Sequence, residues 1–135
     1  MPLTLDARDP AAMEQAAQRL AAGGLVGMPT ETVYGLAADA GNASAVRGIF
    51  TAKGRPSDHP LIVHIPSATD GDWRAAVAPL AREVPDFAVA LMKAFWPGPL
   101  TLILPRRPEV AAVAAGGQDS VGVRCPSHPV AQALL

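Results

Sequence analysis

Short apolar runs alternate with helical patterns along this chain, and this order limits the possible folds more than any other feature. The runs are bounded by proline, glycine or polar residues and are expected as strands at 25–29, 36–38, 61–65, 100–104 and 120–124. Residues 30–34 form a turn between the first two. Strands that alternate with helices pack as layers around a sheet. The sequence therefore predicts an α/β fold.

Capping residues indicate where the helices begin and end. Asp9 and Pro10 are an N-cap and first-turn pair, and the alanine-rich helix that follows ends at residues 23–24. Three further helices are expected: one capped by Asn42 that stops near 54–56, one over 79–95 that can restart at Pro85, and one that begins at Pro129.

The size and charge of the chain exclude several classes of protein. With 135 residues, 50% of them hydrophobic, it can bury one core and forms one domain at most. A net charge of −1 gives no long-range field that would gather nucleic acid or anionic membrane, so any anion site must be local. No apolar stretch approaches the roughly 20 residues that span a bilayer.

The single cysteine and the polar N-terminus indicate a cytoplasmic protein. Cys125 alone cannot form an intramolecular disulfide or a cysteine-based metal cluster, which fits a reducing compartment. The first nine residues include Asp6, Arg8 and Asp9 and lack the apolar centre of a secretory signal.

Two polar clusters are candidates for a functional site. Lys53, Gly54 and Arg55 follow a predicted helix and could wrap a phosphate, although basic residues at a helix end also suit the helix dipole. Residues 29–35 carry two hydroxyls, a carboxylate and a phenol after an apolar strand, where a cleft is common. A turn that satisfies its own backbone is the alternative.

Three further segments hold polar or aromatic residues inside apolar surroundings. His64 lies within a predicted strand, where a hydrogen-bonded core histidine is more common than a ligand. Arg124 ends an apolar strand, so it either needs a buried partner or is solvated at the strand end. Phe95 and Trp96 are expected to pack a helix onto the next strand.

Five segments in this order resemble the YrdC-type L-threonylcarbamoyladenylate synthase family, and the resemblance covers essentially the whole chain. They are 29–36 (PTETVYGL), 53–56 (KGRP), 60–64 (PLIVH), 95–101 (FWPGPLT) and 121–124 (VGVR), followed by His128 and Pro129. The resemblance implies a YrdC-like fold of three αβα layers with a twisted mixed sheet, which some schemes class as α+β.

The resemblance also implies a reaction and its participants. Within the family, the domain forms threonylcarbamoyl-AMP and pyrophosphate from L-threonine, bicarbonate and ATP, usually with Mg²⁺, for tRNA modification. This chain is therefore expected to be a nucleotidyltransferase that works with tRNA-modification proteins and can contact tRNA. No protein ligand is expected for the Mg²⁺.

Matching positions carry the family's site residues over to this sequence. The implied L-threonine pocket consists of Thr32, His64 and Arg124. The implied ATP-binding residues are Arg55, His59 and Ser120. Lys53 and Arg55 are the expected catalytic cations, because adenylation concentrates negative charge on the phosphates. Thr30 and Tyr34 are expected to support the residues that form these two binding sites.

One departure from the family pattern concerns the end of the sequence. In the family, a Ser-Ala-Asn segment follows the helix that begins near His128 and completes both pockets, whereas this sequence stops at Leu135. We therefore expect residues 1–135 to be a C-terminally truncated, partial YrdC-like domain. On that expectation, it is inactive alone and forms homo-oligomers through an exposed sheet edge.

Two other functions fit parts of the pattern. A double-stranded RNA or tRNA-binding module of the same fold without catalysis is the main alternative, although the near-zero charge and the six aromatic residues give it little support. A carbamoyl-transfer domain of the hydrogenase-maturation type shares the fold and chemistry. That class normally carries zinc-finger segments, which a single cysteine excludes.

Overall fold

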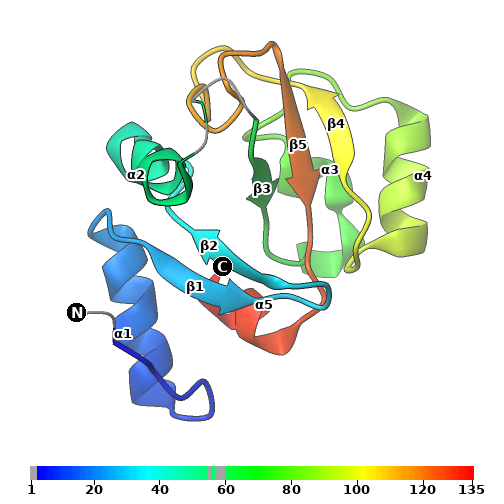
Figure 1. Ribbon diagram of the computed structural model, residues 1–135. Coiled ribbons are helices and arrows are strands. Elements are labelled where there is room, and N and C mark those ends of the chain that lie inside the picture. The colour runs from blue at the N-terminus through cyan, green and yellow to red at the C-terminus, as the bar shows by residue number, and fades with distance from the viewer. Residues whose placement is uncertain (1–2, 55, 57–59) are drawn as a thin grey trace.

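The computed structural model describes residues 3–54, 56 and 60–135 as helices and short strands that alternate along the chain (Figure 1). The helices are α1 (Pro10–Ala21), α2 (Ala43–Lys53), α3 (Trp73–Val77), α4 (Asp86–Phe95) and α5 (Pro129–Leu134), with a 3₁₀ turn η1 at Thr69–Gly71. The strands are β1 (Val26–Pro29), β2 (Tyr34–Ala37), β3 (Ile62–His64), β4 (Leu102–Pro105) and β5 (Ser120–Arg124). None of the helices is long and apolar enough to cross a membrane, as far as the chain is described.

The strands form two sheets. β1 and β2 are an antiparallel hairpin, whereas β3, β5 and β4 form a mixed sheet in that order, with β3 parallel and β4 antiparallel to β5. The hairpin passes below the mixed sheet in Figure 1. The predicted combination of helices with a mixed sheet is therefore confirmed. The pairing places His64 of β3 directly beside Arg124 of β5.

Local signals set the ends of the first two long helices, as the sequence predicted. The Asp9 side chain accepts a hydrogen bond from the Ala11 N–H, and the Asn42 side chain accepts one from the Ala45 N–H. These bonds satisfy backbone donors that a helix start leaves unpaired. Gly54 ends α2 with a φ of +65°, a left-handed conformation that glycine adopts at little cost.

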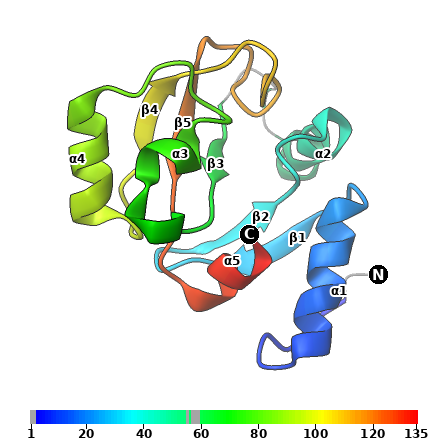
Figure 2. The same cartoon turned by 180° about the vertical axis from the view of Figure 1, so that it is seen from behind.

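One face of the mixed sheet carries the apolar core. Val121 and Val123 of β5 are fully covered there, and α3 lies across this face with α4 beside it (Figure 2). Trp73 and Trp96 meet edge to face with ring centroids 5.5 Å apart, and the Trp96 indole N–H donates to the Leu100 carbonyl. Because side chains alternate along a strand, Gly122 and Arg124 belong to the opposite face.

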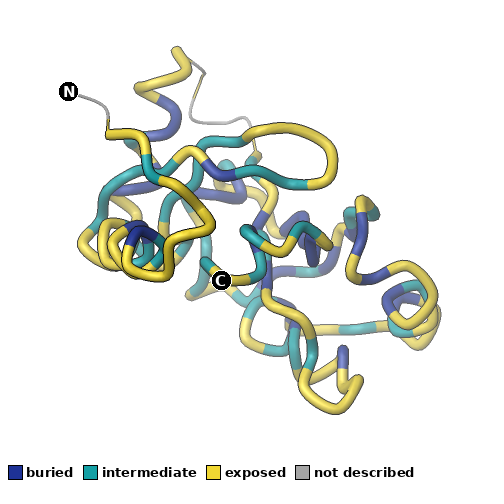
Figure 3. Tube along the Cα trace, turned by 90° about the horizontal axis from the view of Figure 1, so that it is seen from below, coloured by how far each residue is buried: buried dark blue, intermediate teal, exposed yellow. Residues whose placement is uncertain are grey.

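The N-terminal part of the chain is covered much less. In α1 only Ala12 and Ala16 are buried, and in β1 only Met28 is (Figure 3). The strand predicted at 25–29 exists but is only partly buried, because the hairpin pairs with no third strand in the described chain. Apolar packing therefore holds this part less firmly than the mixed sheet.

The helix predicted over 79–95 is wrong in its first part. Residues 79–84 are not helical, α4 begins after Pro85, and α3 was not predicted. The reason is a tertiary contact: Ala81 forms an isolated β-bridge with Arg106, and the Arg82 N–H donates to the Pro105 carbonyl. The segment therefore follows the end of β4 instead of continuing a helix.

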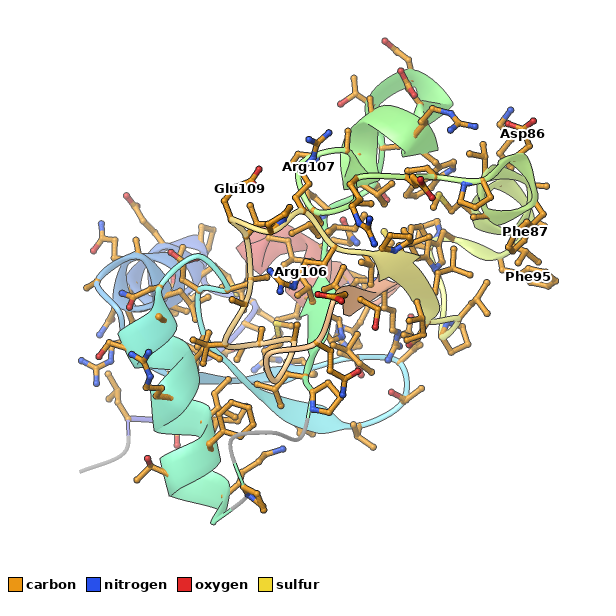
Figure 4. The ribbon with its side chains drawn as sticks, turned by 90° about the horizontal axis from the view of Figure 1, so that it is seen from above. Asp86, Phe87, Phe95, Arg106, Arg107 and Glu109 are labelled. Atoms are coloured by element: carbon orange, nitrogen blue, oxygen red, sulfur yellow. The ribbon has the colours of Figure 1, made fainter. Side chains whose placement is uncertain are left out.

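For the aromatic pair at the end of α4, Phe95 and Trp96, one of the two predictions was correct. Trp96 is buried as expected, but Phe95 is 57% exposed and does not pack onto the next strand. Figure 4 shows Phe95 with Phe87 at the outer side of α4. A helix that packs against the sheet on one face leaves the opposite face in solvent.

Arg106 organises the long connection between β4 and β5 (Figure 4). The side chain is buried, and its guanidinium donates to the backbone carbonyls of Arg107, Pro108, Val110 and Gln118. A buried cation must have its donors satisfied, and here carbonyl oxygens do so. The connection also reaches β3, since the Ala114 carbonyl accepts from the Leu61 N–H.

Candidate functional site

A cleft of about 620 Å³ lies between the hairpin, the end of α2 and the outer face of the mixed sheet. Ala114 and the C-terminal Leu134 and Leu135 contribute apolar walls. The polar or charged side chains that line it are Thr30, Asp39, Lys53, His64 and Arg124. Four of these five are residues that the sequence predicted for the site, and Asp39 was missed.

Arg124 is the most constrained polar residue of the cleft. It is 7% exposed, its Nε donates to the Gly98 carbonyl at 3.1 Å, and its Nη1 donates to Thr32 Oγ1 at 3.2 Å. Its Nη2 forms an ion pair with Glu31. Burial lowers the pKa of Arg124, but the guanidinium stays charged because arginine is not deprotonated in proteins and a carboxylate lies against it.

These contacts decide between the two expectations for Arg124: it is a buried cation with a partner and is not solvated at a strand end. Sequence reasoning missed that partner, Glu31. Its side chain is 22% exposed, and its second oxygen accepts hydrogen bonds from both the backbone N–H and the hydroxyl of Ser127. The available signal was the rule that a buried cation needs an anion, applied to the carboxylate of the 29–35 segment.

Thr30 satisfies its own turn and also faces the cleft. Its hydroxyl donates to the Val33 carbonyl at 2.9 Å and accepts from the Val33 N–H at 3.2 Å, which is the self-satisfied turn considered as the alternative for this segment. The Thr30 and Thr32 hydroxyls are 3.0 Å apart. The turn thereby fixes Thr32 where it meets Arg124, so the local role and the role at the cleft coexist.

His64 lines the cleft from β3, next to Arg124, and is half-buried. Loss of hydration lowers its pKa below the ordinary value near 6.5, because burial disfavours the charged imidazolium. At neutral pH the ring is therefore uncharged and offers one donor and one acceptor nitrogen. A neutral imidazole beside a cationic guanidinium suits a ligand with both a carboxylate and a hydroxyl or amide group.

Lys53 ends α2 and lines the cleft from that helix, whereas Arg124 lines it from β5. Asp39 lines the same cleft and Glu31 is paired with Arg124, so each cation has a carboxylate in its surroundings. Lys53 also stands in the last helical turn, so the helix-dipole interpretation holds as well. Arg55 and His59 lie outside the described residues.

Three predicted site residues, Thr32, Tyr34 and Ser120, are not among those that line the cleft. Thr32 is connected to it through its hydrogen bond with Arg124. Tyr34 is 83% exposed at the start of β2. Ser120 begins β5, whereas Arg124 ends it, which separates them by roughly 13 Å at about 3.3 Å per residue. Tyr34 and Ser120 belong to the elements that border the cleft, but the structure does not bring their side chains to it.

Metal ligation by the protein has no candidate in the part of the chain that the structure describes. No group of three or more His, Cys, Asp or Glu side chains in that part is arranged to hold a metal ion. Cys125 is a free and buried thiol.

The chain is similar to proteins of one family over most of its length. Residues 18–135 match the Sua5/YciO/YrdC family model, described as "Telomere recombination". The chain is 51% identical to the threonylcarbamoyl-AMP synthase of Pyrococcus abyssi, covering 84% of this chain and 32% of that relative. It is 46% identical to the threonylcarbamoyl-AMP synthase of Bacillus subtilis, covering 97% of this chain and 36% of that relative.

The fold agrees with a solved structure as well. The crystal structure of P. abyssi Sua5 complexed with L-threonine superposes with a TM-score of 0.84 and 48% identity, covering 93% of this chain and 35% of that one. The predicted fold family is therefore confirmed. This chain spans about a third of the length of these relatives.

Proposed function

The chain belongs to the Sua5/YciO/YrdC family, and from this premise we propose that it carries the site of an L-threonylcarbamoyladenylate synthase. The proposed reaction joins L-threonine, bicarbonate and ATP into threonylcarbamoyl-AMP and pyrophosphate, with one water released when the threonine nitrogen and bicarbonate form the carbamate. Two relatives named threonylcarbamoyl-AMP synthase and a structural relative in complex with L-threonine support this assignment.

The observation that carries the proposal is the fixed guanidinium of Arg124 at the cleft. A planar guanidinium binds a carboxylate through paired, charge-assisted hydrogen bonds. Backbone and side-chain partners hold Arg124 in place before any ligand arrives, which reduces the entropy lost on binding. We assign the carboxylate of L-threonine to Arg124 and its hydroxyl or amino group to His64 and the hydroxyls of Thr30 and Thr32.

The nucleotide is assigned to the basic side of the cleft. Lys53 lines it. Arg55, His59 and Ser120 are proposed to complete the ATP site on the strength of the family pattern alone, which for Ser120 requires that the nucleotide extend beyond the cleft to the start of β5. Mg²⁺ would be held by the phosphates of ATP and would help to neutralise their charge. Within the chain, Lys53 and Arg55 would stabilise the negative charge that develops on the departing pyrophosphate.

The proposed adenylation needs no protein nucleophile. An oxygen of the carbamate on the threonine nitrogen attacks the α-phosphorus of ATP. The bond from that phosphorus to the bridging oxygen breaks, and pyrophosphate leaves with the electron pair. The protein contributes by holding the carbamate and the phosphate in line, which is an effect of proximity, and by limiting water around the carbamate.

Use of the product in tRNA modification, within the cytoplasm, completes this proposal. Direct binding of double-stranded RNA or tRNA is the second candidate. The composition does not favour it, because the net charge is −1 and nucleic-acid binding usually needs an excess of basic residues. RNA affinity that falls steeply with salt, together with no consumption of ATP, would support that candidate instead.

Pyrophosphate release tests the proposed reaction. The complete natural protein that carries these residues is incubated with ATP, Mg²⁺, bicarbonate and one amino acid at a time. We expect release to require both bicarbonate and L-threonine. Equal release with leucine or glycine, or release that is independent of bicarbonate, would contradict the assignment.

A further inference from the structure

We propose that Glu31 is a positioning residue for Arg124: anchored by Ser127, it holds the guanidinium in the orientation that receives the substrate carboxylate. This inference rests on the proposed function, because that proposal gives Arg124 the carboxylate of L-threonine. It adds a residue that neither lines the cleft nor touches the substrate, and that acts only through Arg124.

First, the N–H groups of Arg124 are divided between protein partners and the ligand. A guanidinium has five N–H groups. Nε donates to Gly98, one N–H of Nη1 donates to Thr32, and Nη2 is buried with Glu31 as its polar partner within the described chain. Three N–H groups therefore have protein partners. Of the other two, the one on Nη2 is buried, which leaves at most the second N–H of Nη1 for a ligand.

The second step is the anchoring of Glu31 itself. One carboxylate oxygen contacts Arg124, while the other accepts from both the N–H and the hydroxyl of Ser127. A carboxylate held by two donors on one side keeps its place when the cation on the other side binds a ligand. Glu31 therefore acts as a fixed support and not as a mobile counter-ion.

The third step is where Glu31 lies relative to the cleft. Arg124 lines the cleft, whereas neither Glu31 nor Ser127 is among its lining residues in the described chain. Glu31 thus contacts the guanidinium without itself lining the cleft. A carboxylate that competed with the substrate would have to share the cleft with it.

The fourth step is that no other described contact could replace this one. Gly98 and Thr32 hold Nε and Nη1, but they leave Nη2 without an acceptor if Glu31 is changed. A buried N–H without an acceptor favours rotation of the group toward any acceptor nearby. Loss of Glu31 should therefore disorder the edge of the guanidinium that the substrate needs.

Steady-state kinetics of the complete natural protein test this role through Glu31→Gln, which keeps the size of the side chain. We expect KM for L-threonine to rise about 10- to 100-fold, as for loss of a charge-assisted contact. KM for ATP should stay within about twofold, because Lys53 and the phosphate side are unaffected. Glu31→Asp should recover part of the loss, and Glu14→Gln, an exposed change on α1, should have no effect.

Ser127→Ala provides a second variant that leaves both ion-pair partners in the chain. It should raise KM for L-threonine in the same direction but less, since it removes one of the two donors that anchor Glu31. Should Glu31→Gln fail to fold, as judged by the near-ultraviolet signal of Trp73 and Trp96, Ser127→Ala decides the outcome.

A nuclear magnetic resonance measurement separates this inference from the proposed reaction. The Arg124 Nε–H, assigned by its loss in Arg124→Lys, should give a protected signal in the natural protein and a broadened or absent one in Glu31→Gln. If the natural protein lacks threonine-dependent turnover, the proposed function fails, but this signal still tests the positioning role. An unchanged signal, equal KM changes for both substrates, or tighter threonine binding in Glu31→Gln would overturn the inference.

Discussion

The mixed sheet with α3 and α4, here the sheet region, and α1, the hairpin and α5, here the hairpin region, are held together by different forces. The sheet region contains most of the buried cluster, including Val77, Met92, Val121 and Val123. The hairpin region buries Ala12, Ala16, Met28 and Ala131. Burial of apolar surface stabilises by about 25 cal/mol per Å², so the sheet region is the more stable part.

The cleft lies at the boundary between these two regions, and polar contacts cross that boundary. Thr32 and Glu31 of the hairpin turn bind Arg124 of β5, and Glu31 also binds Ser127. Directional contacts fix geometry better than apolar packing, but each is lost when one partner is removed. The comparison teaches that the site depends on a few polar residues, whereas the fold depends on many apolar ones.

Removal of Arg124 should have the largest effect, because it removes the polar contacts between the two regions and leaves the apolar core unchanged. Arg124→Ala removes the cation of the ion pair with Glu31 and the guanidinium to which the carboxylate of L-threonine is assigned. We expect kcat/KM for L-threonine to fall by at least about 100-fold. Arg47→Ala, an exposed change on α2, is the matched control. A similar fall of kcat/KM in Arg47→Ala would show that loss of any positive charge, and not the position of Arg124, causes the effect.

The same substitution in each region tests the difference in packing. Met92→Ala in the sheet region removes a fully buried side chain and should lower the free energy of unfolding by about 2–5 kcal/mol. Met28→Ala should cost about 2 kcal/mol or less, because Met28 lines the open cleft and its loss creates no closed cavity. Urea titration measures both. A larger loss for Met28→Ala would reverse the ranking of the regions.

Lys53 tests the side of the cleft that lies away from the boundary contacts. Lys53→Ala should reduce kcat/KM for ATP by about 10- to 100-fold with little change in the free energy of unfolding, because the side chain is exposed at the end of α2. Lys93→Ala on α4 serves as the control. Normal ATP kinetics in Lys53→Ala would mean that Lys53 only ends a helix.

The smallest expected effect concerns discrimination between L-threonine and L-serine. Serine lacks one methyl group, whose burial contributes on the order of 1 kcal/mol, so the ratio of kcat/KM values should be about tenfold or less. Competition between the two amino acids in the pyrophosphate assay measures this ratio. A ratio far above this range would require a polar contact that rejects serine, which the lining residues do not suggest.

Sequence reasoning predicted what neighbouring residues decide. The helix ends are examples, because the residues that decide them lie next to them in the sequence: Asp9 begins α1, Asn42 begins α2 and Gly54 ends α2. Strand β5 also has the predicted bounds. The convergence of Thr30, Lys53, His64 and Arg124 on one cleft was also anticipated, through the family resemblance.

The features that sequence reasoning missed depend on distant partners. The contact between Thr32 and Arg124 joins residues 92 positions apart, and the adjacent pairing of Arg124 with Glu31 has no local signal. Likewise, the bridge from Ala81 to Arg106 replaces a helix that local propensity favoured. Tertiary contacts of this kind become visible only when the chain is folded.

The carbonyl cage around Arg106 has a consequence for how the sequence of the β4–β5 connection can vary. Its acceptors are backbone oxygens of Arg107, Pro108, Val110 and Gln118, which every amino acid supplies. Substitutions at those four positions therefore preserve the cage so long as the backbone path is kept, whereas Arg106 itself is irreplaceable, even by lysine. The β4–β5 connection can therefore vary in sequence as long as Arg106 is kept. This includes the part that places Ala114 at the cleft.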